Sequence, residues 1–259
     1  MDLPPPSLAV APPLRIAGLN KRFGDKVALN DLSISVPSGA CYGLVGPNGS
    51  GKSTTMRTVV GLSRADSGTV EVCGIRTDQD IIGVRRVMGV MLDPLQLFDR
   101  LSAREFVTTI GELRQLAPEV VRARSDEMFD VLEIAHDADR PISGYSHGMR
   151  KKTALIAALL HRPRLVMLDE PFEGVDPVST RTMRAMLDRF RAGGGTVLLS
   201  THVMDVVERV CDHIGIIRDG QIVIAGPIDA IRAGRSLEDA FIAAVGATDV
   251  NAADLDWLG

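Results

Sequence analysis

The chain has 259 residues, of which 45% are apolar, and 29 lysines and arginines against 33 aspartates and glutamates leave a formal net charge of −4. At about 150 residues per domain, this length predicts one or two domains with a large buried core. The charge balance argues against a nucleic-acid partner, and no apolar run approaches the roughly 20 residues that cross a bilayer. Three cysteines without C-x-x-C spacing indicate reduced thiols of a cytosolic chain.

Residues 1–13 are rich in proline and lack a positively charged start, so we interpret them as a disordered leader, neither a signal peptide nor a helix. The segments that follow alternate short apolar runs with turn residues, which is typical of strands. A helix is predicted over residues 52–62, directly after a glycine-rich turn. The predicted strands of this first part are residues 14–19, 32–36, 40–45, 68–72 and 88–92.

A charged, helical region predicts an insert that spans about residues 94–160. Within it, Ser102 and Glu105 form an S-x-x-E capping box, and Pro118 starts a second helix. Beyond the insert, residues 164–168 and 196–199 are compact apolar runs, typical of parallel strands that are buried on both faces. Two later strands, 214–218 and 221–224, are predicted to form a hairpin through a two-residue Asp-Gly turn.

The segment Gly46-Pro-Asn-Gly-Ser-Gly-Lys-Ser-Thr54 fits the pattern G-x-x-x-x-G-K-[ST] and lies between a predicted strand and a predicted helix. Glycines allow backbone N–H groups to turn toward one anion, the helix adds its positive end, and the lysine reaches the β and γ phosphates. The segment therefore predicts a nucleoside triphosphate site. Its expected nucleotide-binding residues are Gly46, Pro47, Asn48, Gly49, Ser50, Gly51, Lys52, Ser53 and Thr54, with Ser53 also a Mg²⁺ ligand.

Two acids end the apolar run at residues 164–168, at the carboxyl edge of the predicted sheet. We expect Asp169 to hold Mg²⁺ and Glu170 to orient or deprotonate the water that attacks the γ-phosphate. The alternative is that both acids merely begin a solvated loop, which the nearby phosphate loop disfavours.

The order of several motifs resembles the ATP-binding subunits of ABC transporters. Asp169-Glu170-Pro171 is followed by Gly174-Val-Asp176-Pro177 and by Ser200-Thr-His202, and residues 145–150 stand where that family has its L-S-G-G-Q signature. The resemblance covers about residues 14–246 and leaves residues 247–259 as a C-terminal tail. It implies an α/β P-loop NTPase fold, with a mixed, mostly parallel core sheet, an antiparallel β subdomain and the helical insert.

In that family, two cassettes sandwich two ATP molecules head to tail. By resemblance, Ser146 and Gly148 bind the γ-phosphate across the dimer, where the N-terminus of the signature helix favours an anion. His202 senses the same phosphate and acts in catalysis with Glu170, and Asp176 couples the two sites.

The resemblance also implies that Phe23 stacks on adenine and that Val27 packs nearby. Each assignment has a structural alternative when taken alone. Phe23 would be a core aromatic residue, His202 a capping or core histidine, and Ser146 an N-cap.

The sequence departs from the family at two places. Asp93 stands where the family has a glutamine that helps to ligate Mg²⁺, so we expect Asp93 to act as a carboxylate ligand. The signature keeps its serine and second glycine, but Tyr145, His147 and Met149 differ from the family pattern. The basic run at residues 150–152 is interpreted as a solvated face of the signature helix.

The resemblance implies an ATPase subunit that uses ATP and Mg²⁺ and lies on the cytoplasmic face of the membrane. It implies a separate membrane permease and a homodimer, or a heterodimer with another cassette, as partners. The segment from Leu237 to Phe241 is similar to the L-E-x-x-F ending of daunorubicin-type export ATPases, which favours export. Three alternatives stay open: an ABC-type ATPase not coupled to transport, an importer subunit, and a generic P-loop kinase.

Overall fold

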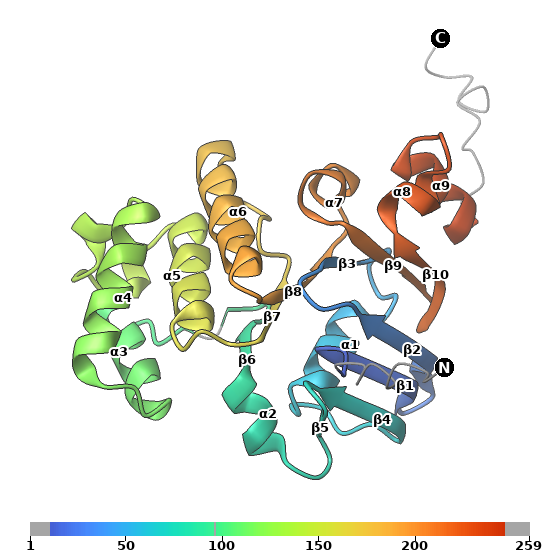
Figure 1. The fold of residues 1–259 in the computed structure, drawn as a ribbon, viewed down its shortest axis with the longest axis horizontal. Coiled ribbons are helices and arrows are strands. Elements are labelled where there is room, and N and C mark those ends of the chain that lie inside the picture. Colours follow the sequence, from blue (N-terminus) through green and yellow to red (C-terminus); the bar gives the residue numbers. More distant parts are fainter. Residues whose placement is uncertain (1–10, 96, 247–259) are drawn as a thin grey trace, which may run out of the picture.

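The computed structural model describes residues 11–95 and 97–246, and Figure 1 shows their arrangement. Two sheets lie next to each other, and a group of helices covers the far side of the larger one. The predicted leader lies outside the described residues except for 11–13, which are not helical. The predicted tail, 247–259, also lies outside them.

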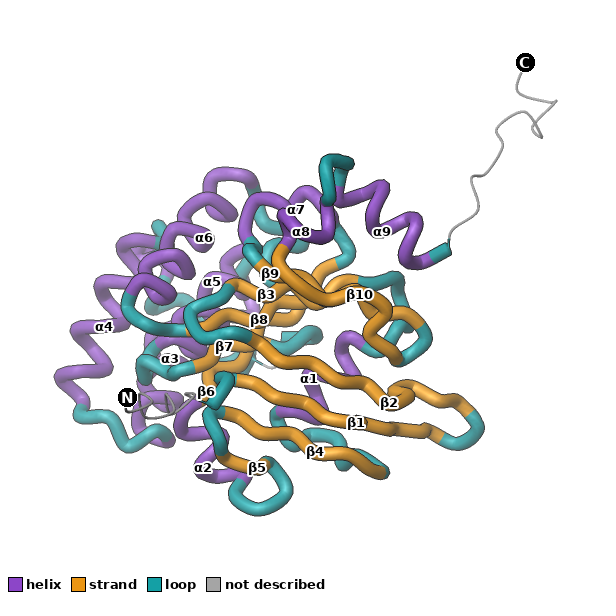
Figure 2. The backbone as a smooth tube through the Cα atoms, turned by 45° about the vertical axis from the view of Figure 1, so that its right-hand side comes forward, coloured by secondary structure: helices purple, strands orange, loops and turns teal. Residues whose placement is uncertain are grey.

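The smaller sheet is antiparallel, with the strand order β2-β1-β4-β5. Its strands lie side by side in Figure 2. In β2, Leu32, Ile34 and Val36 alternate with exposed residues, so that one face of the strand is buried. The strands are β1 (Leu14–Phe23), β2 (Lys26–Val36), β4 (Ser67–Val72) and β5 (Ile75–Arg76).

The core sheet has the order β10-β9-β3-β8-β7-β6, and only β10 is antiparallel to its neighbour. Every residue of β3, β7 and β8 is buried, as strands covered on both faces require. The parallel arrangement brings the carboxyl ends of β3, β6, β7 and β8 to one edge. The strands are β3 (Cys41–Val45), β6 (Met88–Met91), β7 (Leu165–Asp169), β8 (Thr196–Thr201), β9 (His213–Arg218) and β10 (Gln221–Pro227).

Helix α1 (Lys52–Val59) packs in a core formed by both sheets. Met56 and Val59 of this helix belong to one buried cluster with Ile34 of β2 and with Leu44 and Met167 of the core sheet. The helix ends before the predicted residue 62, and Gly61 has a φ of +74°. This packing fixes α1, and therefore the loop before it, against the sheet edge.

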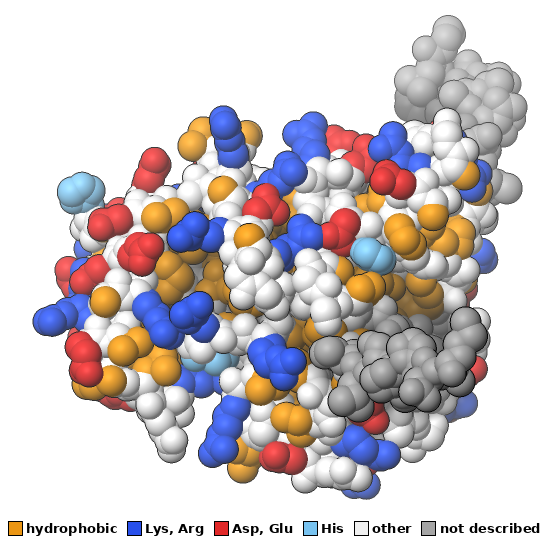
Figure 3. All heavy atoms as spheres, viewed as in Figure 1, with side chains coloured by type: hydrophobic (Ala, Val, Ile, Leu, Met, Phe, Trp, Pro, Cys, Tyr) orange, Lys and Arg blue, Asp and Glu red, His pale blue; other side chains and the backbone are white. Residues whose placement is uncertain are grey.

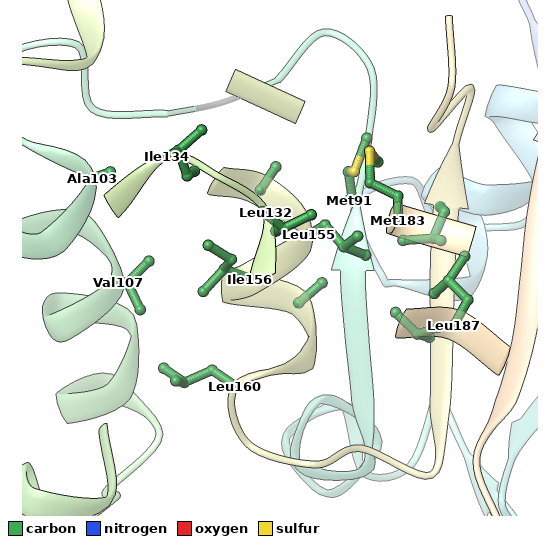
Figure 4. Packing of buried hydrophobic residues seen from close by; sticks show 14 of the residues in the cluster. Met91, Ala103, Val107, Leu132, Ile134, Leu155, Ile156, Leu160, Met183 and Leu187 are labelled. Atoms are coloured by element: carbon green, nitrogen blue, oxygen red, sulfur yellow. The ribbon is translucent and has the colours of Figure 1, made fainter. Parts of the chain in front are cut away.

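The helical insert covers the other face of the core sheet. Its capping box is confirmed, since Ser102 and Glu105 each bond the other's backbone at the start of α3. Figure 4 shows Leu155 and Ile156 between the side chains of the insert and those of the core, including Met183. The helices of the insert are α3 (Ala103–Leu113), α4 (Pro118–Val131) and α5 (His147–Leu159), with 3₁₀ turns at Ala135–Asp137 and Ile142–Gly144. Helix α6 (Pro177–Ala192) follows β7 and packs in the same buried cluster.

The remaining helices are short. Helix α2 (Ile81–Val87) lies between β5 and β6, whereas α7 (Met204–Val210), α8 (Ile228–Arg232) and α9 (Leu237–Val245) share a third buried cluster with β3 and β9. On the face seen in Figure 3, basic and acidic side chains are interspersed. None of the helices described here is long and apolar enough to cross a membrane.

Candidate nucleotide-binding and hydrolysis site

The phosphate loop connects β3 to α1, and two of its glycines are sterically required. A Cβ at Gly46 would lie 2.3 Å from the carbonyl oxygen of Ile217. A Cβ at Gly51 would lie 2.8 Å from the carbonyl oxygen of Ala28, and Gly51 has a φ of +115°. The glycines therefore let the loop run closely beneath β2 and β9, with the N-terminus of α1 at its end.

Lys52 is buried at the start of α1, and its ammonium lies inside the loop. Nζ donates to the carbonyl oxygens of Gly46, at 2.7 Å, and Pro47, at 3.2 Å. Burial lowers the pKa of Lys52, while the carboxylates of Glu170 and Asp169 act in the opposite direction. The loop thus holds a partly desolvated cation, to which a phosphate group is a well-matched partner.

The phosphate loop opens into a cleft of about 410 Å³, which lies within the usual range of roughly 300–1,000 Å³ for ligand sites. The sequence predicted most of its lining but missed Lys26, Ala28 and Glu173. Val27 is exposed beside the cleft, but it does not line it. The predicted residues that line the cleft are Phe23, Asn48, Gly49, Gly51, Lys52, Ser53, Thr54, Asp93, Asp169, Glu170 and His202.

The two acids occupy different environments at the end of β7. Asp169 is its last residue and only 2% exposed, and its carboxylate accepts a hydrogen bond from the hydroxyl of Ser200 on β8. Glu170 follows with a φ of +46°, and its N–H donates to the carbonyl oxygen of Ser200 at 3.2 Å. Pairing of β7 with β8 therefore places both acids at the edge where β3 also ends.

His202 lies directly beside Glu170. Its Nδ1 is 2.8 Å from Oε1 of Glu170. The contact depends on topology, because His202 follows β8, whereas Glu170 follows β7, and these strands are paired in parallel. The carboxylate has an imidazole partner that fixes its orientation at the cleft.

Three oxygen-bearing side chains suited to Mg²⁺ line the same cleft. They are the hydroxyl of Ser53 and the carboxylates of Asp93 and Asp169, contributed by α1 and by the segments at the ends of β6 and β7. Mg²⁺ prefers oxygen ligands, and one or two carboxylates together with substrate phosphates are its usual environment. The donor set therefore fits the ion.

Phe23 is a surface residue and not a core aromatic. It is 53% exposed at the end of β1, and Nζ of Lys21 lies 5.2 Å from the centre of its ring. The ring lines the end of the cleft that is formed by β1, β2 and the phosphate loop. An exposed aromatic face at this place is available for stacking on a flat base.

The predicted signature residues do not line this cleft. Ser146 is the N-cap of α5, and its Oγ accepts from the N–H of Met149 at 3.2 Å. A Cβ on Gly148 would lie 3.9 Å from the carbonyl oxygen of Gly174, in the loop that leads to α6. The signature segment and the segment before α6 are therefore neighbours on a surface outside the chain's own cleft.

Asp176 is the N-cap of α6. Its carboxylate accepts from the N–H of Ser179 at 2.9 Å. Hydrogen bonds from Ser179 hold the pKa of Asp176 below its usual value. The aspartate thus begins the helix that follows directly on Gly174 and Val175, the residues beside the signature segment.

The interpretation of residues 150–152 as a solvated face is wrong for two of the three. Lys151 has an exposed fraction of 0%, and its Nζ donates to the carbonyl oxygen of Glu170; Lys152 is also buried. Only Arg150 fits the expectation in part, with an ion pair to the exposed Asp99 at 2.7 Å. The reason is that α5 packs with its basic turn against the loop after β7, where the carbonyl oxygen of Glu170 accepts a hydrogen bond from the Lys151 ammonium.

Comparison with known proteins decides the family. A model of the family described as ABC transporter matches residues 29–173, more than half of the chain. The chain belongs to the ABC transporter family. It is therefore an ATP-binding cassette with the ATPase chemistry of that family, and the alternative of a generic P-loop kinase is set aside.

The cassette is similar to curated export proteins over most of its length. It is 33% identical to Nod factor export ATP-binding protein I of Burkholderia lata over 219 residues, which covers 85% of this chain and 72% of that protein. It is 32% identical to daunorubicin resistance ATP-binding protein DrrA3 of Streptomyces coeruleorubidus over 220 residues, which covers 85% of this chain and 70% of that protein. The expected family and its export-type relatives are both confirmed.

Solved structures confirm the expected fold. The ATP-binding subunit of an ABC transporter superposes with a TM-score of 0.84 at 26% identity, covering 89% of this chain and 98% of that one. A dimeric cassette in a post-hydrolysis state, bound to ADP and Pi, has a TM-score of 0.76 at 23% identity, covering 83% of this chain and 98% of that one. The mixed core sheet, antiparallel subdomain and helical insert are thus those of a cassette.

Proposed function

We propose that this cassette hydrolyses Mg²⁺-ATP to drive export through a separate membrane permease, and that it lies peripherally at the cytoplasmic face. The observation that carries the proposal is the convergence of the phosphate loop, the acids after β7 and His202 on one cleft. The names of its relatives, a Nod factor exporter and a daunorubicin resistance protein, support export as the direction.

ATP binding uses groups from both sheets. Backbone N–H groups of the phosphate loop and the ammonium of Lys52 hold the phosphates, while the exposed ring of Phe23 stacks on the adenine. Ser53, Asp169 and Asp93 would hold Mg²⁺, which would supply positive charge to offset the negative charge of the phosphates.

Glu170 prepares the attacking water. Its carboxylate accepts the water's hydrogen bond and its proton, and the contact of 2.8 Å with His202 fixes the carboxylate's direction. His202 also donates to the γ-phosphate through its other ring nitrogen. Hydrolysis is then an in-line displacement in which the chain supplies orientation and charge.

A second cassette completes the site. Ser146 and Gly148 lie at the N-terminus of α5 and outside the chain's own cleft, so the γ-phosphate that they bind belongs to a second cassette, a copy of this chain or a different one. Asp176 lies beside them and couples the two sites.

Steady-state turnover of the purified full-length chain tests this assignment. Glu170→Gln is expected to lower kcat by at least about 100-fold while ATP affinity stays within twofold, since only the proton acceptor is removed. Lys52→Ala is expected to weaken ATP binding by about 100-fold, because a charge-assisted contact to phosphate is lost.

Glu112→Gln on the exposed face of α3 is the matched control and should leave both quantities unchanged. Equal kcat for wild type and Glu170→Gln would refute the proposed role of Glu170. Equal ATP affinity for wild type and Lys52→Ala would refute that of the phosphate loop.

A further inference from the structure

Lys151 is a fully buried lysine at the catalytic edge of the sheet. It lies in the second turn of α5, and its Nζ donates to the carbonyl oxygen of Glu170. None of the ion pairs among the described residues includes this ammonium. A buried lysine without a partner is costly, so this hydrogen bond is what allows the ammonium to stay at this position.

Burial opposes the charged form of Lys151, and nearby carboxylates offset only part of that effect. Burial lowers the pKa of Lys151, but the carboxylates of Glu173, Asp93, Glu170 and Asp169 all act to raise it, Glu173 most strongly. Three of these carboxylates carry proposed roles in Mg²⁺ binding or hydrolysis, and all four line the nucleotide cleft. The ammonium therefore lies behind the acidic wall of the cleft.

The residue that Lys151 contacts has an unfavourable backbone conformation. Glu170 has a φ of +46°, in the left-handed region that residues with a side chain rarely adopt. Its N–H is fixed by the carbonyl oxygen of Ser200 at 3.2 Å, and its carboxylate reaches His202 at 2.8 Å. Its carbonyl oxygen accepts from Lys151 and, at 3.3 Å, from the N–H of Glu173.

We propose that Lys151 is a positioning residue for ATP hydrolysis: its ammonium holds the carbonyl of Glu170, and so keeps the carboxylate of that residue against His202 at the cleft. Within the described part of the chain, that carbonyl accepts two hydrogen bonds. One comes from Glu173 in the same loop, and the other, from Lys151, comes from α5. The inference rests on the proposed role of Glu170.

Helix α5 gives this contact a second consequence. The same helix begins at the signature segment, and Ser146 and Lys151 are five residues apart, a rise of roughly 7–8 Å along an α-helix. A rigid helix thus joins the segment proposed to bind one nucleotide to the carbonyl behind the catalytic glutamate of the chain's own cleft.

Two substitutions separate the hydrogen bond from other effects of burial. Lys151→Met keeps an unbranched side chain of similar length without a donor, and Lys151→Gln keeps an N–H donor without the charge. We expect Lys151→Met to lower kcat by roughly 10- to 100-fold with KM for ATP and ATP affinity within twofold of wild type. Lys151→Gln should recover part of the lost kcat.

Arg124→Gln provides the matched control. Arg124 likewise donates to a backbone carbonyl of another element, that of Leu160 at 2.8 Å, but it lies outside the cleft. Its replacement should leave kcat and KM unchanged. Wild-type kcat in Lys151→Met, or no recovery by Lys151→Gln, would overturn the proposal.

A double-mutant cycle supplies the decisive readout. Because Lys151 acts through Glu170, Lys151→Met should cause no further loss of single-turnover rate when Glu170 is already glutamine. Multiplicative losses would indicate a purely structural role and overturn the proposal. If Glu170→Gln itself leaves turnover unchanged, the proposed function fails; if only Lys151→Met does so, the inference alone fails.

Discussion

Phe23 is an exposed residue whose proposed function depends on its neighbours. Its ring is 53% exposed, and its partners are the edge of the cleft and Lys21. A large exposed aromatic ring adds little to folding, and its place beside the phosphate loop fits the proposed stacking on a flat ligand. From the sequence alone, Phe23 could be interpreted either as a base-stacking residue or as a core residue. The burial of its ring depends on where β1 ends relative to β3, which the sequence does not show.

Phe23→Ala should weaken ATP binding with little loss of stability. Base–aromatic stacking contributes about 1–3 kcal/mol, which corresponds to roughly 5- to 150-fold in Kd. Phe98→Ala is the matched control, since Phe98 is 55% exposed and lies outside the cleft. Titration with a fluorescent ATP analogue measures both, and equal Kd values for the two variants would contradict the adenine role of Phe23.

Lys151 marks a limit of sequence reasoning at the residue scale. A lysine between Arg150 and Lys152 has the pattern of a solvated basic face, yet it is fully buried. Its burial depends on the loop after β7, about twenty residues further along the chain, where the carbonyl oxygen of Glu170 accepts its hydrogen bond. No spacing rule within α5 contains that information.

At the scale of elements, the sequence predicted those whose signals are local. Ser102 and Glu105 start α3 through a capping box, and the alternation in β2 follows its buried face. The phosphate loop was also predictable, because its glycines are required by the close approach of Ala28 and Ile217. The two-residue strand β5 and the seven-residue helix α2 were missed, the first because it is too short for a pattern and the second although Asp80 caps it.

Helix caps provide the test at this scale. Ser102 and Ser146 are both serine N-caps, and alanine at either should lower the free energy of unfolding by about 1 kcal/mol. Only Ser146→Ala should also weaken ATP-dependent dimerisation, because only Ser146 has a proposed ligand in a second cassette. Urea unfolding and light scattering measure the two effects, and equal dimerisation of both variants would leave Ser146 as a cap alone.

The proposed mechanism divides the nucleotide chemistry of the whole molecule between two surfaces. One is the cleft, formed where β1, β3, β6, β7 and β8 end, and the other is the surface where α5 and α6 begin. The second surface holds Ser146, Gly148 and Asp176, next to one another and outside the chain's own cleft. If two cassettes lie head to tail, the cleft of each one faces the surface of the other at which α5 and α6 begin.

The most direct test of this arrangement is light scattering on the full-length Glu170→Gln variant, with and without Mg²⁺-ATP. The account predicts that ATP doubles the molar mass, because bound nucleotide is held by both cassettes and is not hydrolysed. The double variant Lys52→Ala, Glu170→Gln should stay monomeric. A Glu170→Gln protein that binds ATP and remains a monomer would contradict completion of the site by a second copy of this chain.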